Sequence, residues 1–262
     1  MQNVFYENVK KDPNLRLLSP LSPVHYIAYI ASQWDPKSPW ADPWVRLAAS
    51  LAIDRQTLAD VHMPGCGPIG SLATAGDPLS VSFPAHPYDP QRAKKLLAEA
   101  GYPNGFNGGK YYPHEGGYWA HGEQIANYWK AVGVTMETLL LDRPALLAMR
   151  NAKKMAGAVF VEIIPQPSIA GRLSFLLGPR SYGKYPEIEA PWEEFNRTVD
   201  PKVRKELIGK VQKLIYEKVL WIPLTGTNSP AAFGPRVKGN PYKIQPSIWF
   251  PAPLEDIELV EK

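Results

Sequence analysis

Apolar side chains recur at spacings of three and four residues behind three Asp-Pro pairs. The pairs are Asp42-Pro43, Asp89-Pro90 and Asp200-Pro201. An aspartate before the first turn caps free backbone N–H groups, and a proline at the first helical position has no N–H to satisfy. Each pair therefore predicts the start of an amphipathic helix. Asp54 and Asp142 predict further short helices, and Gly101 predicts a left-handed stop after the second pair's helix.

Between these helices the apolar period changes to that of strands. Residues 125–132 are typical of a helix closed by Gly133, and residues 134–140 then alternate between apolar and polar. Residues 158–164 form a continuous β-rich run of the kind found in buried strands. Because helix and strand alternate, the centre of the chain is predicted to be a compact α/β domain.

The two ends of the chain have a different pattern. Residues 14–31 and 221–260 hold short β-rich runs that are split by proline and glycine. We expect these runs to pair with each other in a partial sheet away from the central domain. The chain would then pass twice between two bodies, near residues 31–36 and 225–232. Clefts at such hinges are common ligand sites.

Composition and charge limit the class of protein. The chain has 262 residues, of which 45% are hydrophobic and 21% are charged, as in globular proteins. The net charge of +4 is spread without a basic block, so nucleic acid is not expected as a partner. The single cysteine, Cys66, can form no internal disulfide. No apolar run approaches the length of a membrane span, and the first residues show no export signal.

Motifs that could carry chemistry are weak in this sequence. Residues 65–70 match G-x-G-x-x-G, but they follow a predicted helix and contain Pro68, which favours a plain loop over a dinucleotide site. Ser71 lacks the glycine that a nucleophile elbow requires two residues earlier. Glutamates are frequent between residues 187 and 194, where a solvated helix face is the favoured interpretation.

Histidine spacing leaves a metal site open without favouring it. Two sets could be arranged around an ion, namely His62 with Cys66, and His114 with Glu115, His121 and Glu123. The spacing of both sets is generic, and it suits a solvent-facing loop equally well. We therefore expect no metal and no other cofactor.

Two long stretches resemble a known family. Residues 42–55, D-P-W-V-R-L-A-A-S-L-A-I-D-R, are similar to the pattern D-x-R-V-R-x-A-x-x-x-A-I-D-R. Residues 88–106, Y-D-P-Q-R-A-K-K-L-L-A-E-A-G-Y-P-N-G-F, are similar to Y-D-P-x-x-A-x-x-L-L-x-E-A-G-Y-P-x-G-F. Residues 222–224 and 235–239 match later segments of the same family. The chain resembles the extracytoplasmic substrate-binding proteins of ABC importers, in the peptide/nickel class called family 5.

The resemblance implies an α/β fold of the periplasmic-binding-protein type II kind. Residues 34–228 would form the α/β lobe II, and residues 1–33 and 229–262 would supply the strands of a partial, β-rich lobe I. The resemblance covers about the C-terminal half of a usual family member. The first lobe, a small extra domain and the export signal are therefore expected to be missing from the sequence as given.

The implied function is non-catalytic capture of a small solute, peptide-like or other, between two lobes. The solute would then be delivered to the permease subunits of an ABC importer. The protein would contact the membrane only indirectly, through these subunits. The implied location is periplasmic or extracytoplasmic, and no enzymatic activity is implied. Two alternatives stay open: a truncated or non-functional fragment of such a protein, and a hydrolase or metal-binding protein.

The solute contacts are expected just beyond the strand at residues 158–164, because α/β sheets bind ligands at the carboxyl ends of their strands. Peptide-binding members of the family have G-W-x-x-D-Y there, whose acid pairs with a peptide amino group. This chain has F-V-E-I-I-P-Q-P at residues 160–167, without Trp or Asp, so the solute class stays open. The candidate ligand-binding residues are Glu162, Gln166, Arg172, Tyr182 and Tyr185.

Overall fold

The structure is a computed structural model that describes residues 2–18, 21–74, 76–113, 119–163, 166–178, 181–228, 231–239 and 257–260. Its α-helices are α1 (Gln2–Lys11), α2 (Pro43–Leu51), α3 (Arg55–His62), α4 (Pro90–Glu99), α5 (Trp119–Ala131), α6 (Arg143–Asn151), α7 (Ile169–Leu177), α8 (Pro186–Arg197) and α9 (Pro201–Glu217). Its strands are β1 (Arg16–Leu18), β2 (Leu21–Ile30), β3 (Phe106–Tyr112), β4 (Val134–Thr138), β5 (Ala158–Ile163), β6 (Trp221–Asn228) and β7 (Ala231–Phe233). Short 3-10 helices cover Ala31–Trp34 and Pro39–Ala41.

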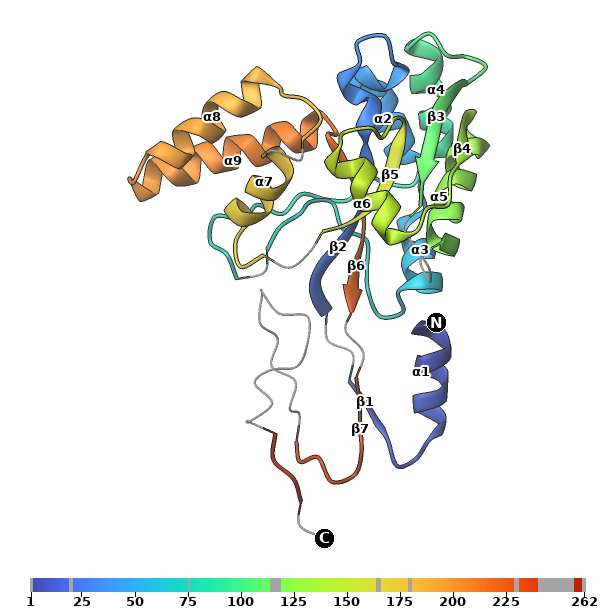
Figure 1. Ribbon diagram of the computed structural model, residues 1–262, viewed down its shortest axis with the longest axis vertical. Helices are drawn as coiled ribbons and strands as arrows, with labels where there is room; N and C mark the ends of the chain where they lie inside the picture. Colours follow the sequence, from blue (N-terminus) through green and yellow to red (C-terminus); the bar gives the residue numbers. More distant parts are fainter. Residues whose placement is uncertain are drawn as a thin grey trace.

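The larger sheet has five strands in the order β4-β3-β5-β2-β6. Strand β3 is parallel to β4 and β5, whereas β2 is antiparallel to both β5 and β6. Side chains alternate across β2, so that Ala28 and Ile30 join one apolar cluster while Ile27 joins the other. The first cluster packs against α2 to α5, and the second against α6 to α9 (Figure 1). The sheet is thus buried on both faces, as an α/β sheet must be.

The predicted helix starts are confirmed by their caps. Side chains of five aspartates accept hydrogen bonds from backbone N–H groups in the first turns of α2, α3, α4, α6 and α9; these are Asp42, Asp54, Asp89, Asp142 and Asp200. The predicted stop after α4 is also confirmed, because Gly101 has a φ of +94°. At that φ a side chain would be strained.

Two buried arginines fasten α2 and α3 to β6 and the turn before it. The Arg46 guanidinium donates to the carbonyl oxygens of Trp40 and Lys218 at 2.7 and 2.6 Å. The Arg55 guanidinium donates to the Pro223 carbonyl at 2.7 Å. Burial lowers the pKa of Arg55 to about 10, so it still carries its charge at neutral pH. Both arginines of the stretch at residues 42–55 are therefore buried and hold the backbone of neighbouring elements together.

The terminal β-runs pair with each other as predicted, but not all of them lie away from the central domain. Residues 21–30, grouped above with the terminal partial sheet, form β2 in the middle of the five-stranded sheet. Among the residues that the structure describes, only β1 and β7 form a separate two-stranded sheet, which lies beyond one end of the larger sheet (Figure 1). The apolar run alone indicated a strand, and its pairing with β5, from Ile30 with Ala158 to His25 with Ile163, decided its sheet.

The chain crosses between the two sheets at two adjacent places. Leu21 pairs with Asn228 at the end of the larger sheet, and Leu18 pairs with Ala231 in the smaller one. Both crossings therefore fall between these pairs. The second crossing agrees with the predicted segment at 225–232, whereas the first does not fall at residues 31–36. That segment packs inside the larger body, where Gln33 is buried and donates to the Leu220 carbonyl at 3.1 Å.

Candidate functional site: the carboxyl edge of the large sheet

The carboxyl ends of β5 and β6 lie at the same edge of the large sheet. Ile163, the last residue of β5, is opposite His25, and Asn228, the last residue of β6, is opposite Leu21. The two-stranded sheet lies beyond this edge (Figure 1). Five residues separate the end of β5 from the start of α7, so the N-terminus of this helix is also brought here. This edge, with the first turn of α7, is called the carboxyl edge below.

Arg172 is a buried, hydrogen-bonded polar side chain at the carboxyl edge. It is 1% exposed, and its Nη1 lies 2.8 Å from His25 Nδ1 and 3.2 Å from the Leu72 carbonyl oxygen, to which it donates. Burial, with the Arg172 charge as a second cause, lowers the pKa of His25 to about 3. His25 is therefore neutral and accepts from the guanidinium. Arg172 ties α7 to β2 from within, and it is not displayed to a solute.

Glu162 and Gln166 also lie at the carboxyl edge. Glu162 is half-buried on β5 and opposite Tyr26 in the pairing with β2. Gln166 is half-buried too, and its Oε1 would lie 3.0 Å from a Cβ placed on Gly171. Its amide therefore covers the first turn of α7. Three of the five candidate residues thus lie at one edge of the sheet, Glu162 on the face of Phe160 and the other two on the face that α7 covers.

Tyr182 and Tyr185 lie at the opposite end of β5. The Tyr182 backbone N–H donates to Tyr29 Oη at 3.3 Å, and Tyr29 is opposite Val159 near the start of β5. The Tyr185 ring packs on Trp34, with 4.6 Å between ring centroids. The two tyrosines are therefore not brought together with Glu162. Their placement in a loop after α7 was a weak signal, because loop aromatics also pack loops onto the body of a domain.

His121 is a residue that the sequence pattern named only as a metal ligand. It lies in the first turn of α5, is 1% exposed and stacks on His62 with ring centroids 4.8 Å apart and 6° between the ring planes. Burial, with His62 as a second cause, lowers the pKa of His121 to about 3. His121 lies four residues before Ile125 and eight before Trp129, which places it on the buried face of α5. This spacing could have predicted from the sequence that His121 is buried.

The histidine pair does not make a metal centre. In-plane nitrogen lone pairs of two parallel rings do not converge on one ion, and His62 Nε2 lies 2.7 Å from Gln124 Oε1. The part of the chain that the structure describes holds no group of three or more metal-ligating side chains. His114 and Glu115 of the other predicted set lie outside the described residues.

The glycine motif at residues 65–70 is a loop, as predicted. It follows α3 and runs beside β6, where Gly226 N–H donates to the Gly67 carbonyl at 3.1 Å and Ile69 N–H to the Leu224 carbonyl at 3.2 Å. Ser71, the candidate nucleophile of a hydrolase, donates to the Val81 carbonyl at 3.3 Å and accepts from Phe83 N–H at 3.3 Å. Both partners are backbone groups of the serine's own loop. Neither is a side chain that could act as a general base for the serine.

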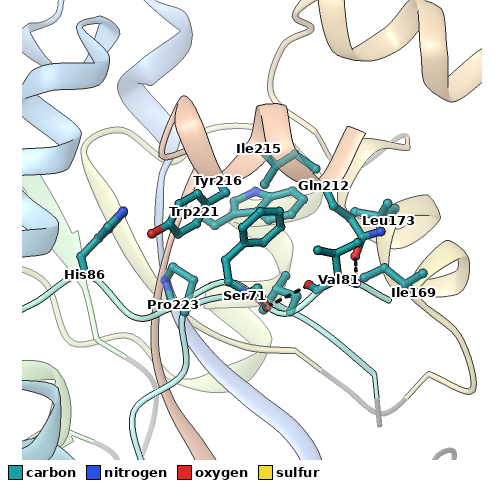
Figure 2. Close-up of a pocket in the computed structure, with 13 residues that line it drawn as sticks. Ser71, Val81, His86, Ile169, Leu173, Gln212, Ile215, Tyr216, Trp221 and Pro223 are labelled. Carbon is teal, nitrogen blue, oxygen red and sulfur yellow. Dashed lines mark hydrogen bonds between the residues drawn. The ribbon is translucent and has the colours of Figure 1, made fainter. Parts of the chain in front are cut away.

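A small cavity lies behind this loop, between α7, α9 and the start of β6 (Figure 2). Its volume of about 30 Å³ is room for a water molecule or two, not for a solute. Figure 2 shows Ser71 and Val81 on the loop side and Gln212 and Ile215 on the helix side. The cavity therefore marks where the loop after residue 70 packs on α9.

Residues 2–168 match the family described as "Bacterial extracellular solute-binding proteins, family 5 Middle". The chain belongs to this family. It is 26% identical over 258 residues to heme-binding protein A of Haemophilus influenzae, covering 88% of this chain and 44% of that protein. It is also 26% identical over 273 residues to the glutathione-binding protein GsiB of Escherichia coli, covering 96% of this chain and 51% of that protein.

Its fold is similar to that of the ABC transporter substrate-binding protein CtaP of Listeria monocytogenes, with a TM-score of 0.85 at 22% identity. That likeness covers 100% of this chain and 55% of CtaP, and it confirms the predicted α/β fold class. The family 5 chain thus spans about half the length of the relatives that it matches. These relatives are solute-binding transport proteins and not enzymes. No helix among the described residues is long and apolar enough to cross a membrane.

Proposed function

We propose that the chain provides one wall and the hinge of a two-lobed protein that captures a small solute at the carboxyl edge. One observation supports this most directly: the chain crosses between its two sheets twice, side by side, between the Leu18–Ala231 pair and the Leu21–Asn228 pair. Two adjacent crossings allow one body to rotate on the other about a narrow axis. A solute held beside such an axis can be enclosed by closure.

The chemistry of the carboxyl edge supports binding without a reaction. Gln166 offers polar atoms beside the first turn of α7, where the Arg172 cation is hydrogen-bonded to the neutral His25 ring. Glu162 offers a carboxylate at the same edge but on the other face of the sheet, the face of Phe160. A few fixed polar groups on a rigid sheet are what a solute site needs. Tyr182 and Tyr185, at the other end of β5, are not part of this proposal.

The solute, the partner and the location follow from the family as proposals. The relatives are named for heme and for glutathione, and we propose a small solute of this size range, peptide-like or other. We further propose that it is handed to the permease of an ABC importer outside the cytoplasm. We propose that the division between the lobes falls at residues 18–21 and 228–231. Strand β2 then belongs to the same lobe as residues 34–228, and that lobe begins earlier in the chain than residue 34.

Hydrogen exchange with solute probes tests this function. The 262-residue chain is incubated separately with millimolar reduced glutathione, hemin and a tetra-alanine peptide, and its peptides are mapped with and without each probe. At least one probe is expected to slow exchange in residues 162–172, and the variant Gln166→Ala is expected to weaken that protection. The matched control Gln56→Ala, on an exposed face of α3, should not. Protection confined to residues 181–185, or none with any probe, contradicts the proposal.

A further inference from the structure

A large groove lies beside α8, at the opposite end of β5 from the carboxyl edge. Its volume is about 600 Å³, within the range of about 300–1,000 Å³ that is usual for small-molecule sites. Its lining comes from the turn after α6, the end of α7, the loop before α8 and α8 itself. Tyr182 places it near the start of β5, because its backbone N–H donates to Tyr29 Oη and Tyr29 is opposite Val159. It is called the α8 groove below.

The walls of the α8 groove are fixed by contacts within the chain. Leu177 and Trp192 contribute apolar side chains that are each 7% exposed. Tyr182 contributes a hydroxyl that donates to the Arg150 carbonyl and accepts from the Met155 N–H, both at 3.3 Å. None of these contacts depends on a ligand, so the groove is formed in advance. A preformed cavity with an apolar wall and a few polar groups is typical of a ligand site.

The charges that line the α8 groove do not balance. Glu189 pairs with Lys184 at 3.4 Å, and Glu193 pairs with Arg197 at 3.5 Å. No other carboxylate is among the described lining residues. Lys153 is a third cation of the lining, and it has no carboxylate partner among the residues that the structure describes. The groove therefore has one positive charge in excess.

The backbone of Lys153 is strained. Its φ is +54°, and it directly follows Ala152, the C-cap residue of α6, at a position where glycine is the usual residue. Val219, the other non-glycine residue of the described chain with a positive φ, is buried in an apolar cluster. Lys153 is exposed, so burial does not account for its side chain. Strained backbone positions of this kind are concentrated at ligand sites.

We propose that the α8 groove is a second ligand site, which takes a small molecule with a carboxylate or phosphate on an apolar body. The Lys153 ammonium pairs with the anionic group, and the apolar body lies against Leu177 and Trp192. This site is separate from the carboxyl edge and does not rest on the function proposed above.

Amide chemical shifts of the ¹⁵N-labelled 262-residue chain test this proposal. Phenyl phosphate, benzoate and benzylammonium each carry one phenyl ring and differ in the charged group, and each is titrated at pH 7 and constant ionic strength. Phenyl phosphate is expected to shift the amides of Lys153, Ser181 and Asn196 along a saturable curve. Benzoate should shift the same amides more weakly, and benzylammonium should leave them in place.

The variant Lys153→Gly separates a binding role from a structural one. Glycine removes the ammonium, so the affinity for phenyl phosphate should fall at least about tenfold, as expected for the loss of a charge-assisted hydrogen bond. Glycine also relieves the strained backbone, so the midpoint of thermal unfolding should rise by about 2–4 °C. Lys153→Arg, which keeps the charge, should retain most of the binding. The matched control Lys154→Ala, an exposed neighbour outside the lining, should bind as the wild type does.

Four results would each overturn the proposal: no saturable shift with either anion, equal responses to phenyl phosphate and benzylammonium, equal affinity in the wild type and Lys153→Gly, or a lower unfolding midpoint in Lys153→Gly. Shifts confined to residues 166–172 would also overturn it, because they would place the anion at the carboxyl edge. The readout is in the α8 groove and the probes are not transported solutes. Failure here therefore leaves the proposed function standing, and failure of the solute probes above leaves this site standing.

Discussion

The two sheets of this chain are built from similar β-rich runs but are stabilised differently. In the large sheet, every residue of β5 except Glu162 is buried, and both faces are covered by helices. In the small sheet, no side chain of β1 or β7 is fully buried. The difference shows that strand pairing alone does not determine how stable a sheet is. Apolar cover on both faces stabilises the large sheet, whereas in the described part of the small sheet the backbone pairing is supplemented by hydrogen bonds from an arginine.

That arginine is Arg16, the first residue of β1. Its guanidinium donates to the carbonyl of Gly239 at 2.8 Å and also to that of Val237, which fastens β1 to the segment that follows β7. Exposed hydrogen bonds of this kind contribute less than the burial of a core side chain. The small sheet is therefore expected to open more easily than the large one.

The largest expected effect comes from a matched pair of phenylalanines, one in each sheet. Phe160 on β5 is 0% exposed, and Phe160→Ala should lower the free energy of unfolding by about 3–5 kcal/mol, the usual cost of removing a buried ring. Phe233→Ala on β7 should cost under about 1 kcal/mol, because Phe233 is half-exposed. Urea denaturation followed by tryptophan fluorescence measures both. Equal losses would show that the sheets share one core.

A smaller effect is expected from the two arginines that fasten the sheets. Arg55→Met removes the buried guanidinium that donates to the Pro223 and Ser50 carbonyls, and it should cost about 2–4 kcal/mol in the same assay. Arg16→Met should change the free energy of unfolding by under about 1 kcal/mol, since its partners can bond to water. A larger loss for Arg16→Met would place the main support of the fold in the small sheet.

Acid is expected to weaken the large body, which contains three histidines with lowered pKa values. Burial is the main cause for each and lowers the pKa of His25 to about 3, that of His86 to about 4 and that of His121 to about 3. Unfolding returns each to about 6.5, so the unfolded state binds more protons below that pH. The free energy of unfolding should therefore fall as the pH falls from 6.5 towards 3.

Urea midpoints at pH 7.5, 6.5, 5.5 and 4.5 measure this slope. In a His86→Gln variant one of the three groups no longer titrates, and its stability should fall less steeply with pH than that of the wild type. A midpoint that is constant from pH 6.5 to pH 4.5 would contradict the burial of these histidines.

The elements of the fold were predictable from the sequence to the extent that their signals are local. Asp42 and Asp200 cap helices through their own neighbours, and a buried run such as residues 158–163 needs no partner to be recognised as a strand. The sheet membership of β2 was not predictable in this way. It depends on pairing with β5 and β6, and the sequence gives no register for contacts that distant.

The same limit applies to the candidate site. Glu162 and Gln166 were found because residues just after a buried strand must lie at its carboxyl end. Tyr182 and Tyr185 lie after a further helix, and the turn of α7 carries them back to the start of β5. The hydrogen bond from the Ile169 N–H to the Asp77 carboxylate, which caps α7, carried no signal. It joins residues 92 positions apart, and Asp77 lies in a loop without periodic apolar positions.

Native-state hydrogen exchange of the 262-residue chain tests most directly the claim that the two sheets are separate bodies joined at residues 18–21 and 228–231. Amides of β6 and β5 are expected to exchange only through global unfolding. Those of β1 and β7 should exchange faster, by a local opening whose free energy does not respond to Phe160→Ala. If instead β1 and β7 exchange at the rate of β6 and lose protection together with it in Phe160→Ala, the two sheets unfold as one body and the hinge does not exist.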